Sequence, residues 1–151
     1  MSVFTLPLFK DTLQNDSVKI VGVVCLESIF PQLVREGVQK GARILAIVTN
    51  DAWYDGTLAP IQHSQIAVLR AIENRVSVLR CANSGVSAMI DPYGNVTAQT
   101  QSATQDILIG SVSVQTEETL FTRYGNTFPV FISILSFIFL LVLTILRLRS
   151  V

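Results

Sequence analysis

The chain has 151 residues, a formal net charge of zero and 50% hydrophobic residues, and its mean hydropathy of +0.50 is high for a water-soluble domain. Its length allows one ordinary domain, and its balanced charge excludes the basic surface of a typical nucleic-acid-binding protein, so we expect no nucleic-acid partner. Two widely separated cysteines and one histidine match no metal-ligand spacing and no disulfide framework, so we also expect no cofactor.

The first part of the chain predicts alternating strands and helices. Residues 18–25 form an apolar, β-branched run of strand length, and Pro31 marks the next boundary. Residues 32–40 have the pattern of a short helix closed by Gly41, and 42–50 read as a second buried strand. Strand, helix and strand within about thirty residues is the βαβ pattern, which predicts a parallel pair.

The next part of the chain adds one more helix and then strands alone. The expected elements are a loop over 50–60, an amphipathic helix over 60–75, a strand over 76–82, a hairpin whose turn is "DPYGN" (91–95), a strand over 106–114 and a polar bridge over 115–127. Together these patterns predict a layered α/β protein whose sheet is completed by antiparallel pairing.

Residues 128–146, "FPVFISILSFIFLLVLTIL", predict a transmembrane helix. The segment carries no charge, and at about 1.5 Å per residue its nineteen residues span roughly 28 Å, close to the hydrocarbon thickness of a bilayer. A buried core helix is the alternative, but the segment is apolar on every face. The expected boundaries are therefore a globular part over 1–117, a linker over 118–127, the span, and a tail over 147–151.

The arginines beside this span predict its orientation. Arg147 and Arg149 follow the span, whereas only Arg123 lies closely before it. Positive residues favour the cytoplasmic side, so we expect a cytoplasmic tail and a globular part outside the cytoplasm.

Cys25 is the candidate for chemistry. It ends the first apolar strand just before a helix, and Asn50 and Asp51 end the second. The carboxyl ends of parallel strands share one edge of a sheet, so these residues could lie on one rim. A cysteine there could attack a carbonyl as a thiolate and form a thioester, with Glu27 nearby as a first-turn carboxylate.

Simpler alternatives stay open at this point. Free cysteine is among the most buried residue types, so Cys25 could simply fill a core. A disulfide between Cys25 and Cys81 is conceivable in an oxidising compartment. His63 could pair with Cys25, but its place near a helix start favours a capping or packing role.

Several stretches together resemble the C-terminal third of the bacterial apolipoprotein N-acyltransferase family. They are "VVCLESIFPQLVR", "TNDAWYDGTLAPIQHSQIAVLRAIENRVSVLRCANSGVSAMIDPYGNV" and "FTRYGNTFPV". The resemblance begins near residue 18 and reaches the end of the chain. It implies the C-terminal part of an αββα nitrilase-like sandwich followed by one transmembrane helix, in the bacterial cytoplasmic (inner) membrane.

The resemblance also implies a reaction and its residues. The family uses a Glu–Lys–Cys triad, whose cysteine takes an acyl chain from a phospholipid and passes it to the N-terminal diacylglyceryl-cysteine of a lipoprotein. Cys25 would be the nucleophile and Glu27 a supporting carboxylate rather than the general base. Trp53 and Tyr54 would line the site near the acyl chain, although Trp53 could equally be a half-buried loop anchor.

Other matching positions have structural roles by the same resemblance. Arg70, Glu73 and Arg80 would be buried or inter-element ion partners. Asn83 and Gly85 would shape the turn between two strands.

The sequence departs from the family pattern. Leu26 stands where a tyrosine commonly follows the nucleophile, and only 24 residues precede Cys25, so the family's glutamate and lysine have no counterpart; neither Lys10 nor Lys19 lies in the lysine motif. We therefore expect a chain that is inactive alone and whose upstream half comes from a parent chain or a second polypeptide. A membrane-anchored nitrilase-like amidase and a non-catalytic nitrilase-like remnant or binding module are the alternatives.

Overall fold

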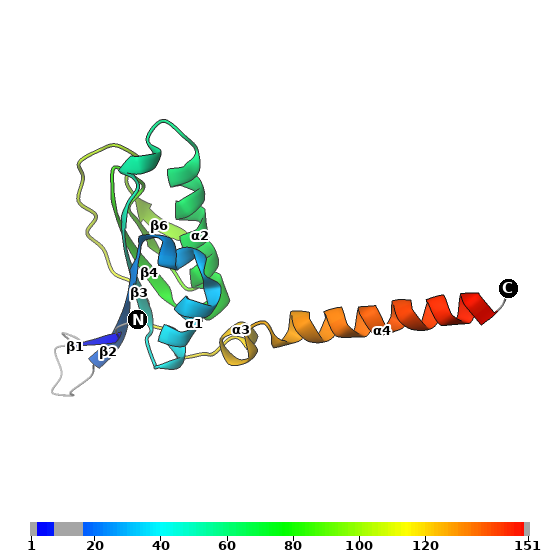
Figure 1. Ribbon diagram of the computed structural model, residues 1–151. Coiled ribbons are helices and arrows are strands. Elements are labelled where there is room, and N and C mark those ends of the chain that lie inside the picture. The colour runs from blue at the N-terminus through cyan, green and yellow to red at the C-terminus, as the bar shows by residue number, and fades with distance from the viewer. Residues whose placement is uncertain (1–2, 8–16, 150–151) are drawn as a thin grey trace.

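The computed structural model describes residues 3–7 and 17–149 (Figure 1). Its elements in chain order are strands β1 (Val3–Pro7) and β2 (Ser17–Val24), the 3₁₀-helix η1 (Cys25–Ile29), helix α1 (Pro31–Gln39), strand β3 (Ile44–Asn50), the 3₁₀-helix η2 (Ala52–Tyr54), helix α2 (Ala59–Asn74), strands β4 (Ser77–Asn83), β5 (Ala88–Ile90) and β6 (Val96–Gln99), and helices α3 (Leu120–Tyr124) and α4 (Thr127–Arg149).

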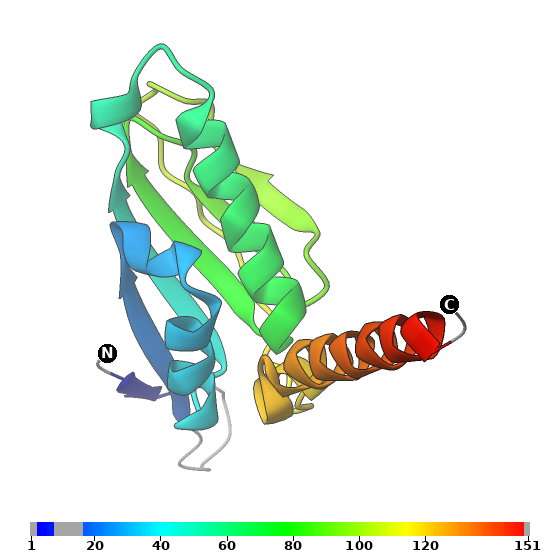
Figure 2. The same ribbon diagram turned by 45° about the vertical axis from the view of Figure 1, so that its right-hand side comes forward.

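The strands form one six-stranded sheet in the order of the sequence, β1-β2-β3-β4-β5-β6. Strands β2, β3 and β4 are parallel, and β1, β5 and β6 pair antiparallel with their neighbours. Helices α1 and α2, which connect the parallel strands, lie on the same face of the sheet (Figures 1 and 2). The predicted βαβ unit and the antiparallel completion of the sheet are confirmed. No strand was predicted over β1.

The hydrophobic core lies between this face and the two helices. Val21, Leu45 and Val78 alternate with outward-facing residues along their strands, and each is fully buried. They pack with apolar side chains of α1 and α2 in one cluster. Burying one such side chain contributes about 1.5–3 kcal/mol, so the helix-covered face provides the main hydrophobic stabilisation of the sheet.

The turn of the β5–β6 hairpin has the predicted chemistry. The Asp91 carboxylate accepts backbone N–H groups from Tyr93 (2.8 Å) and Asn95 (2.9 Å), and Gly94 has a φ of +87°, which favours glycine. Burial raises the pKa of Asp91, but the hydrogen bonds from Asn95 and the turn backbone outweigh it and hold the pKa below its ordinary value.

The opposite face of the sheet is partly open. Val24 and Val48, neighbours in the β2–β3 ladder, are 64% and 59% exposed. The segment 101–118 runs over this side (Figure 1), and its residues 106–108 line a pocket together with β3 and β4 side chains. The strand expected over 106–114 is wrong, because this segment is extended without being paired in the ladder. The sequence of residues 106–114 alternates as in a strand, but the segment crosses the face of the sheet. A strand can pair only with the edge of a sheet, because the backbone groups of the inner strands are already paired.

The polar bridge expected over 115–127 contains helix α3. The Arg35 guanidinium of α1 donates to the backbone carbonyls of Phe121 (3.0 Å), Thr122 (2.8 Å) and Arg123 (2.9 Å). Gln39 also donates to the Thr122 carbonyl. The Phe121 carbonyl also accepts the Gly125 N–H, whereas the Thr122 and Arg123 carbonyls lie at the helix end, where carbonyls lack a partner within the helix. Arg35 and Gln39 satisfy them, so a helix of only five residues is stable when it is docked on α1.

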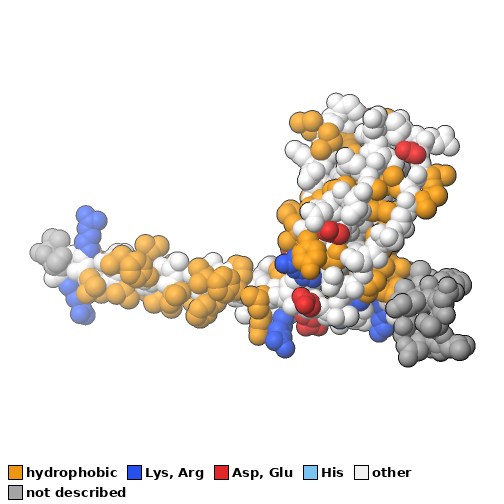
Figure 3. Space-filling model, turned by 180° about the vertical axis from the view of Figure 1, so that it is seen from behind, with side chains coloured by type: hydrophobic (Ala, Val, Ile, Leu, Met, Phe, Trp, Pro, Cys, Tyr) orange, Lys and Arg blue, Asp and Glu red, His pale blue; other side chains and the backbone are white. Residues whose placement is uncertain are grey.

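Helix α4 projects from the globular part as a single rod whose surface carries mainly apolar side chains (Figure 3). It has 23 residues, an 18-residue window of mean hydropathy 2.8 and no part of that window buried. The hydroxyls of Ser133 and Thr144 donate to backbone carbonyls four residues earlier, so these polar groups are satisfied within the helix. Among the described residues, α4 is the one helix that is long and apolar enough to cross a membrane.

Candidate active site at the carboxyl edge of the sheet

Cys25 is the first residue of η1, and it follows β2 directly at a sharp turn of the chain. Its φ is +49°, in the left-handed region, which costs a residue with a side chain roughly 1–2 kcal/mol. The residue is partly buried. Such strain persists only where surrounding contacts hold it, and it is concentrated at functional sites. Cys25 is therefore a partly buried residue at a strained turn, and its role as the nucleophile stays a prediction.

Glu27 fastens this turn. Its carboxylate oxygen Oε2 accepts the backbone N–H of Val24 at 2.8 Å, and the backbone N–H of Phe30 donates to the Glu27 carbonyl at 3.1 Å. The carboxylate thus bonds to the residue just before the cysteine. This geometry is that of a carboxylate that supports the turn, and the catalytic role of Glu27 stays a prediction.

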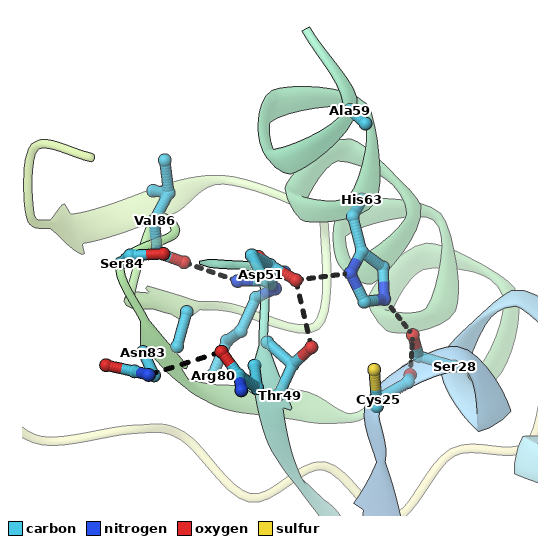
Figure 4. Close-up of polar contacts among 12 residues, drawn as sticks. Cys25, Ser28, Thr49, Asp51, Ala59, His63, Arg80, Asn83, Ser84 and Val86 are labelled. Carbon is cyan, nitrogen blue, oxygen red and sulfur yellow. Dashed lines mark hydrogen bonds and ion pairs between the residues drawn. The ribbon is translucent and has the colours of Figure 1, made fainter. Parts of the chain in front are cut away.

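A chain of hydrogen bonds leads from Cys25 into the helix-covered core (Figure 4). The Ser28 hydroxyl donates to the Cys25 carbonyl at 2.9 Å and lies 2.9 Å from His63 Nε2. His63 Nδ1 lies 2.9 Å from Asp51 Oδ1. Ser28 is 1% and His63 8% exposed, so solvent does not replace these contacts.

Asp51 closes the chain of hydrogen bonds. Although fully buried, its carboxylate accepts from Thr49 Oγ1 at 2.9 Å and from Arg80 Nη2 at 2.7 Å. Burial raises the pKa of Asp51, but the hydrogen bonds from Arg80 and His63 outweigh burial and hold the pKa below its ordinary value. Asp51 is therefore a carboxylate that accepts hydrogen bonds from three elements.

Gly85 allows this arrangement. A Cβ at position 85 would lie 2.2 Å from the Asp51 carboxylate, so only glycine permits the approach. Arg80 also donates to the Val86 carbonyl at 2.6 Å, which ties the same loop to β4. The resemblance assigned Arg80 to an ion pair and Gly85 to this turn, and both assignments are confirmed. Arg70 and Glu73, also expected to be ion partners, pair with each other within α2 at 3.3 Å.

The predicted rim forms as expected. Val24 and Val48 are ladder partners, so Cys25, Asn50 and Asp51 follow the carboxyl ends of adjacent parallel strands. The Asn83 side chain at the end of β4 donates to Asn50 Oδ1 at 3.2 Å.

Trp53 and Tyr54 lie on η2, directly after β3. Trp53 is 82% and Tyr54 38% exposed, so Trp53 is not the half-buried anchor that one interpretation expected. Their role toward a substrate stays a prediction.

Two sequence-based alternatives are resolved by the geometry. Cys25 and Cys81 are both free, so they do not form a disulfide. The ring nitrogens of His63 contact Ser28 and Asp51, which agrees with a packing role and places neither nitrogen on the cysteine. Ser28 and Asp51 were not predicted to interact with each other through His63. No local pattern signals this contact, because it joins three separate segments.

The described residues contain no side-chain cluster of the kind that binds metal ions. Among residues 3–7 and 17–149, no three histidine, cysteine or acidic side chains gather as metal ligands do.

A sheet with two helices on one face, and a strained cysteine turn at the carboxyl edge of its parallel strands, defines a mixed α/β protein. A solved structure supports this fold: Nit3 of Saccharomyces cerevisiae, a nitrilase-superfamily member, superposes with a TM-score of 0.51 and 23% sequence identity over 58% of this chain and 35% of its own.

The chain belongs to the carbon-nitrogen hydrolase family, whose model matches residues 2–120. Among curated relatives, the apolipoprotein N-acyltransferase of Geobacter metallireducens is 42% identical over 106 residues, which cover 70% of this chain and 20% of the relative. The apolipoprotein N-acyltransferase of Chlorobaculum tepidum is 39% identical over 112 residues, which cover 74% and 21%. The chain thus spans about a fifth of the length of these relatives.

Proposed function

We propose that this chain carries the cysteine nucleophile of a phospholipid-dependent N-acyltransferase that acts on the N-terminal diacylglyceryl-cysteine of lipoproteins. The observation that carries the proposal is the strained turn at Cys25, whose φ is +49°. The identity of 42% to a relative named apolipoprotein N-acyltransferase supports the proposed substrate class.

The proposed reaction has two steps. The Cys25 thiolate attacks the ester carbonyl of a phospholipid acyl chain, so that a C–S bond forms, the ester C–O bond breaks and the lysophospholipid oxygen takes a proton. The free α-amino group of the lipoprotein then attacks the thioester, so that a C–N bond forms and the C–S bond breaks. The thiolate is released, and the proton lost by the amine replaces the proton that the base delivered to the lysophospholipid in the first step. Glu27 supports the turn from its bond to the Val24 N–H, and Trp53 and Tyr54 lie near the acyl chain.

Two further catalytic groups come from outside residues 1–151. The base and the cationic partner of the oxyanion are the family's glutamate and lysine, which have no counterpart here. General-base assistance alone is worth about 10²–10⁴-fold in rate, so we expect negligible turnover without them. The open face that exposes Val24 and Val48 is where the second sheet of an αββα sandwich packs in this proposal, whether it comes from a parent chain or a second polypeptide.

The membrane arrangement is part of the proposal. Helix α4 crosses the inner membrane, and the arginines at its C-terminal end (Arg147 and Arg149) lie on the cytoplasmic side. The globular part then lies outside the cytoplasm, where α3 and Arg35 hold it at the membrane surface.

The test offers a phospholipid with a radiolabelled acyl chain and a diacylglyceryl lipopeptide to membranes of source cells whose own copy of the protein containing residues 1–151 carries the tag, so that the upstream half is present and no untagged copy contributes. We expect a hydroxylamine-sensitive label on the chain and transfer of the label to the lipopeptide amine. Cys25→Ser abolishes both signals, whereas the matched variant Cys81→Ser keeps them. Transfer to water instead of the amine would favour the amidase alternative. Absence of label on the wild-type chain, or equal label on Cys25→Ser, would contradict the nucleophile assignment.

A further inference from the structure

Ser28 and His63 take no part in the bonds made and broken by acyl transfer, yet they are buried directly behind the nucleophile. We propose that they are positioning residues: His63, held by Asp51, directs the Ser28 hydroxyl onto the Cys25 carbonyl and so maintains the turn that presents the thiol. This inference rests on the proposed function of Cys25 as the nucleophile.

The strained backbone of Cys25 needs contacts that hold it. With a φ of +49°, the residue stays in the left-handed region only where its surroundings keep it there. The Ser28 hydroxyl bonds to the Cys25 carbonyl itself at 2.9 Å, and the Glu27 carboxylate bonds to the Val24 N–H at 2.8 Å. The two contacts bracket the cysteine, one before it and one at its own carbonyl.

The direction of each hydrogen bond between Cys25, Ser28, His63 and Asp51 follows from which atoms carry a hydrogen. A hydroxyl has one hydrogen, and Ser28 uses it on the Cys25 carbonyl. The 2.9 Å contact between Ser28 Oγ and His63 Nε2 is then a bond in which His63 donates. His63 Nδ1 donates in turn to the Asp51 carboxylate, which has no hydrogen to give. A ring that donates from both nitrogens carries two hydrogens and is an imidazolium, so in this arrangement a charged His63 is paired with the Asp51 carboxylate. Asp51 thus orients the ring so that Nε2–H faces Ser28 and leaves the serine hydrogen for Cys25.

Two simpler roles do not fit the same contacts. Ser28, His63 and Asp51 are connected in the manner of a serine-hydrolase triad, but Ser28 is 1% exposed and its hydrogen bonds to a backbone carbonyl, so its oxygen is not available to a substrate. His63 as the direct base of Cys25 is excluded as well, because Ser28 and Asp51 occupy both of its ring nitrogens.

Loss of the Ser28 contact should move the thiol. Side chains alternate between the faces of a strand, and Val21 and Val23 point into the helix-covered core. If the turn relaxes and Cys25 continues β2, its side chain falls on that same covered face. The thiol then moves from the rim toward the core and reacts more slowly.

The experiment measures this movement without requiring turnover. The full chain in its membrane is treated with iodoacetamide, and the alkylation rates of Cys25 and Cys81 are measured separately by mass spectrometry. Cys81 is free and exposed, so every sample contains its own control. The variants are Ser28→Ala, Ser28→Thr, His63→Gln and the double variant, and Ser64→Ala removes another buried serine hydroxyl as a matched control.

We expect Ser28→Ala to slow Cys25 alkylation about tenfold, the size of change that one lost buried hydrogen bond produces, with Cys81 unchanged. His63→Gln slows Cys25 to the same extent. The double variant is no slower than either single variant, because His63 acts through Ser28. Ser28→Thr keeps the hydroxyl and restores the rate, and Ser64→Ala leaves the rate unchanged.

An unchanged ratio of Cys25 to Cys81 rates in Ser28→Ala overturns the inference, as do single effects that multiply in the double variant. If Ser28→Ala unfolds, both cysteines react faster together, and His63→Gln then decides. The acyl-labelling experiment distinguishes this failure from failure of the proposed function. A wild-type chain that is never acylated refutes the nucleophile, whereas normal acylation of Ser28→Ala refutes only the positioning role.

Discussion

Two buried ion pairs on the helix-covered side of the sheet differ in how completely they are hydrogen-bonded. Arg80 and Asp51 meet at 2.7 Å with both side chains fully buried. Arg70 and Glu73 meet at 3.3 Å on one helix, with side chains 6% and 29% exposed. Asp51 accepts further hydrogen bonds from Thr49 and His63. Among the described residues, Arg80 Nε is the one buried atom of the first pair without a hydrogen-bond partner, whereas the second pair has three such atoms, Arg70 Nε and Nη1 and Glu73 Oε2.

The pKa of the carboxyl group is shifted in opposite directions in the two pairs. Burial raises the pKa of both carboxyl groups. Hydrogen bonds overcome it at Asp51, whose pKa is lowered, whereas at Glu73 the charge of Arg70 only partly opposes it and the pKa stays raised. Directed donors, rather than one opposite charge, therefore keep a buried carboxylate ionised.

The largest expected effect comes from removing Arg80, and the equivalent change at Arg70 is the comparison. Arg80→Leu leaves a buried carboxylate short of its cationic partner, so we expect a loss of about 3–5 kcal/mol in the free energy of unfolding. Arg70→Leu is the matched variant and should cost about 1 kcal/mol or less, because Glu73 can turn to water. Urea unfolding of the full chain in detergent micelles, followed by far-UV circular dichroism, measures both. Equal losses would show that the two pairs are energetically equivalent.

The next effect tests the close approach of Gly85 to Asp51. In Gly85→Ala the new methyl group collides with the carboxylate, and such overpacking costs about 1–3 kcal/mol. Gly110→Ala is the control, because its Cβ meets the sulfur of Met89, 3.0 Å away at the flexible end of a side chain. The same unfolding measurement applies. A Gly85→Ala chain as stable as Gly110→Ala would contradict the tight packing of Asp51.

The smallest effect is on the pH dependence of stability. Because the pKa of Asp51 is lower in the folded chain, its contribution is present above the unfolded pKa and lost as the pH falls through the folded one. Glu73 acts oppositely, since its raised pKa gives a contribution that is lost as the pH rises through the folded value. Thermal unfolding between about pH 7 and about pH 3 should show Glu73→Gln losing stability on acidification at least as steeply as the wild type. A stability of Glu73→Gln that is independent of pH would refute the role of Asp51.

Much of the fold could be predicted from local patterns. The strands β2, β3 and β4, the helices between them and the hairpin turn at Asp91 follow from hydrophobic runs and turn residues that act over a few positions. The wrong strand over 106–114 has the same kind of pattern, but forming a strand depends on an available sheet edge. Helix α3 was missed for a related reason, since Arg35 and Gln39 stabilise it from 80 or more residues away in the sequence.

Residues that are neighbours along the chain were enough to establish the family, the order of the parallel unit, the candidate membrane helix and the place of Cys25 at the end of a strand. Folding in three dimensions was needed to make Asp51 a buried, fully bonded carboxylate and to connect it through His63 and Ser28 to the Cys25 carbonyl. Those contacts join η1, the end of β3, α2 and β4. A hydrogen bond requires its donor and acceptor to lie within about 3 Å of each other. These residues come from separate parts of the sequence, and they reach that distance because the helices pack on the sheet.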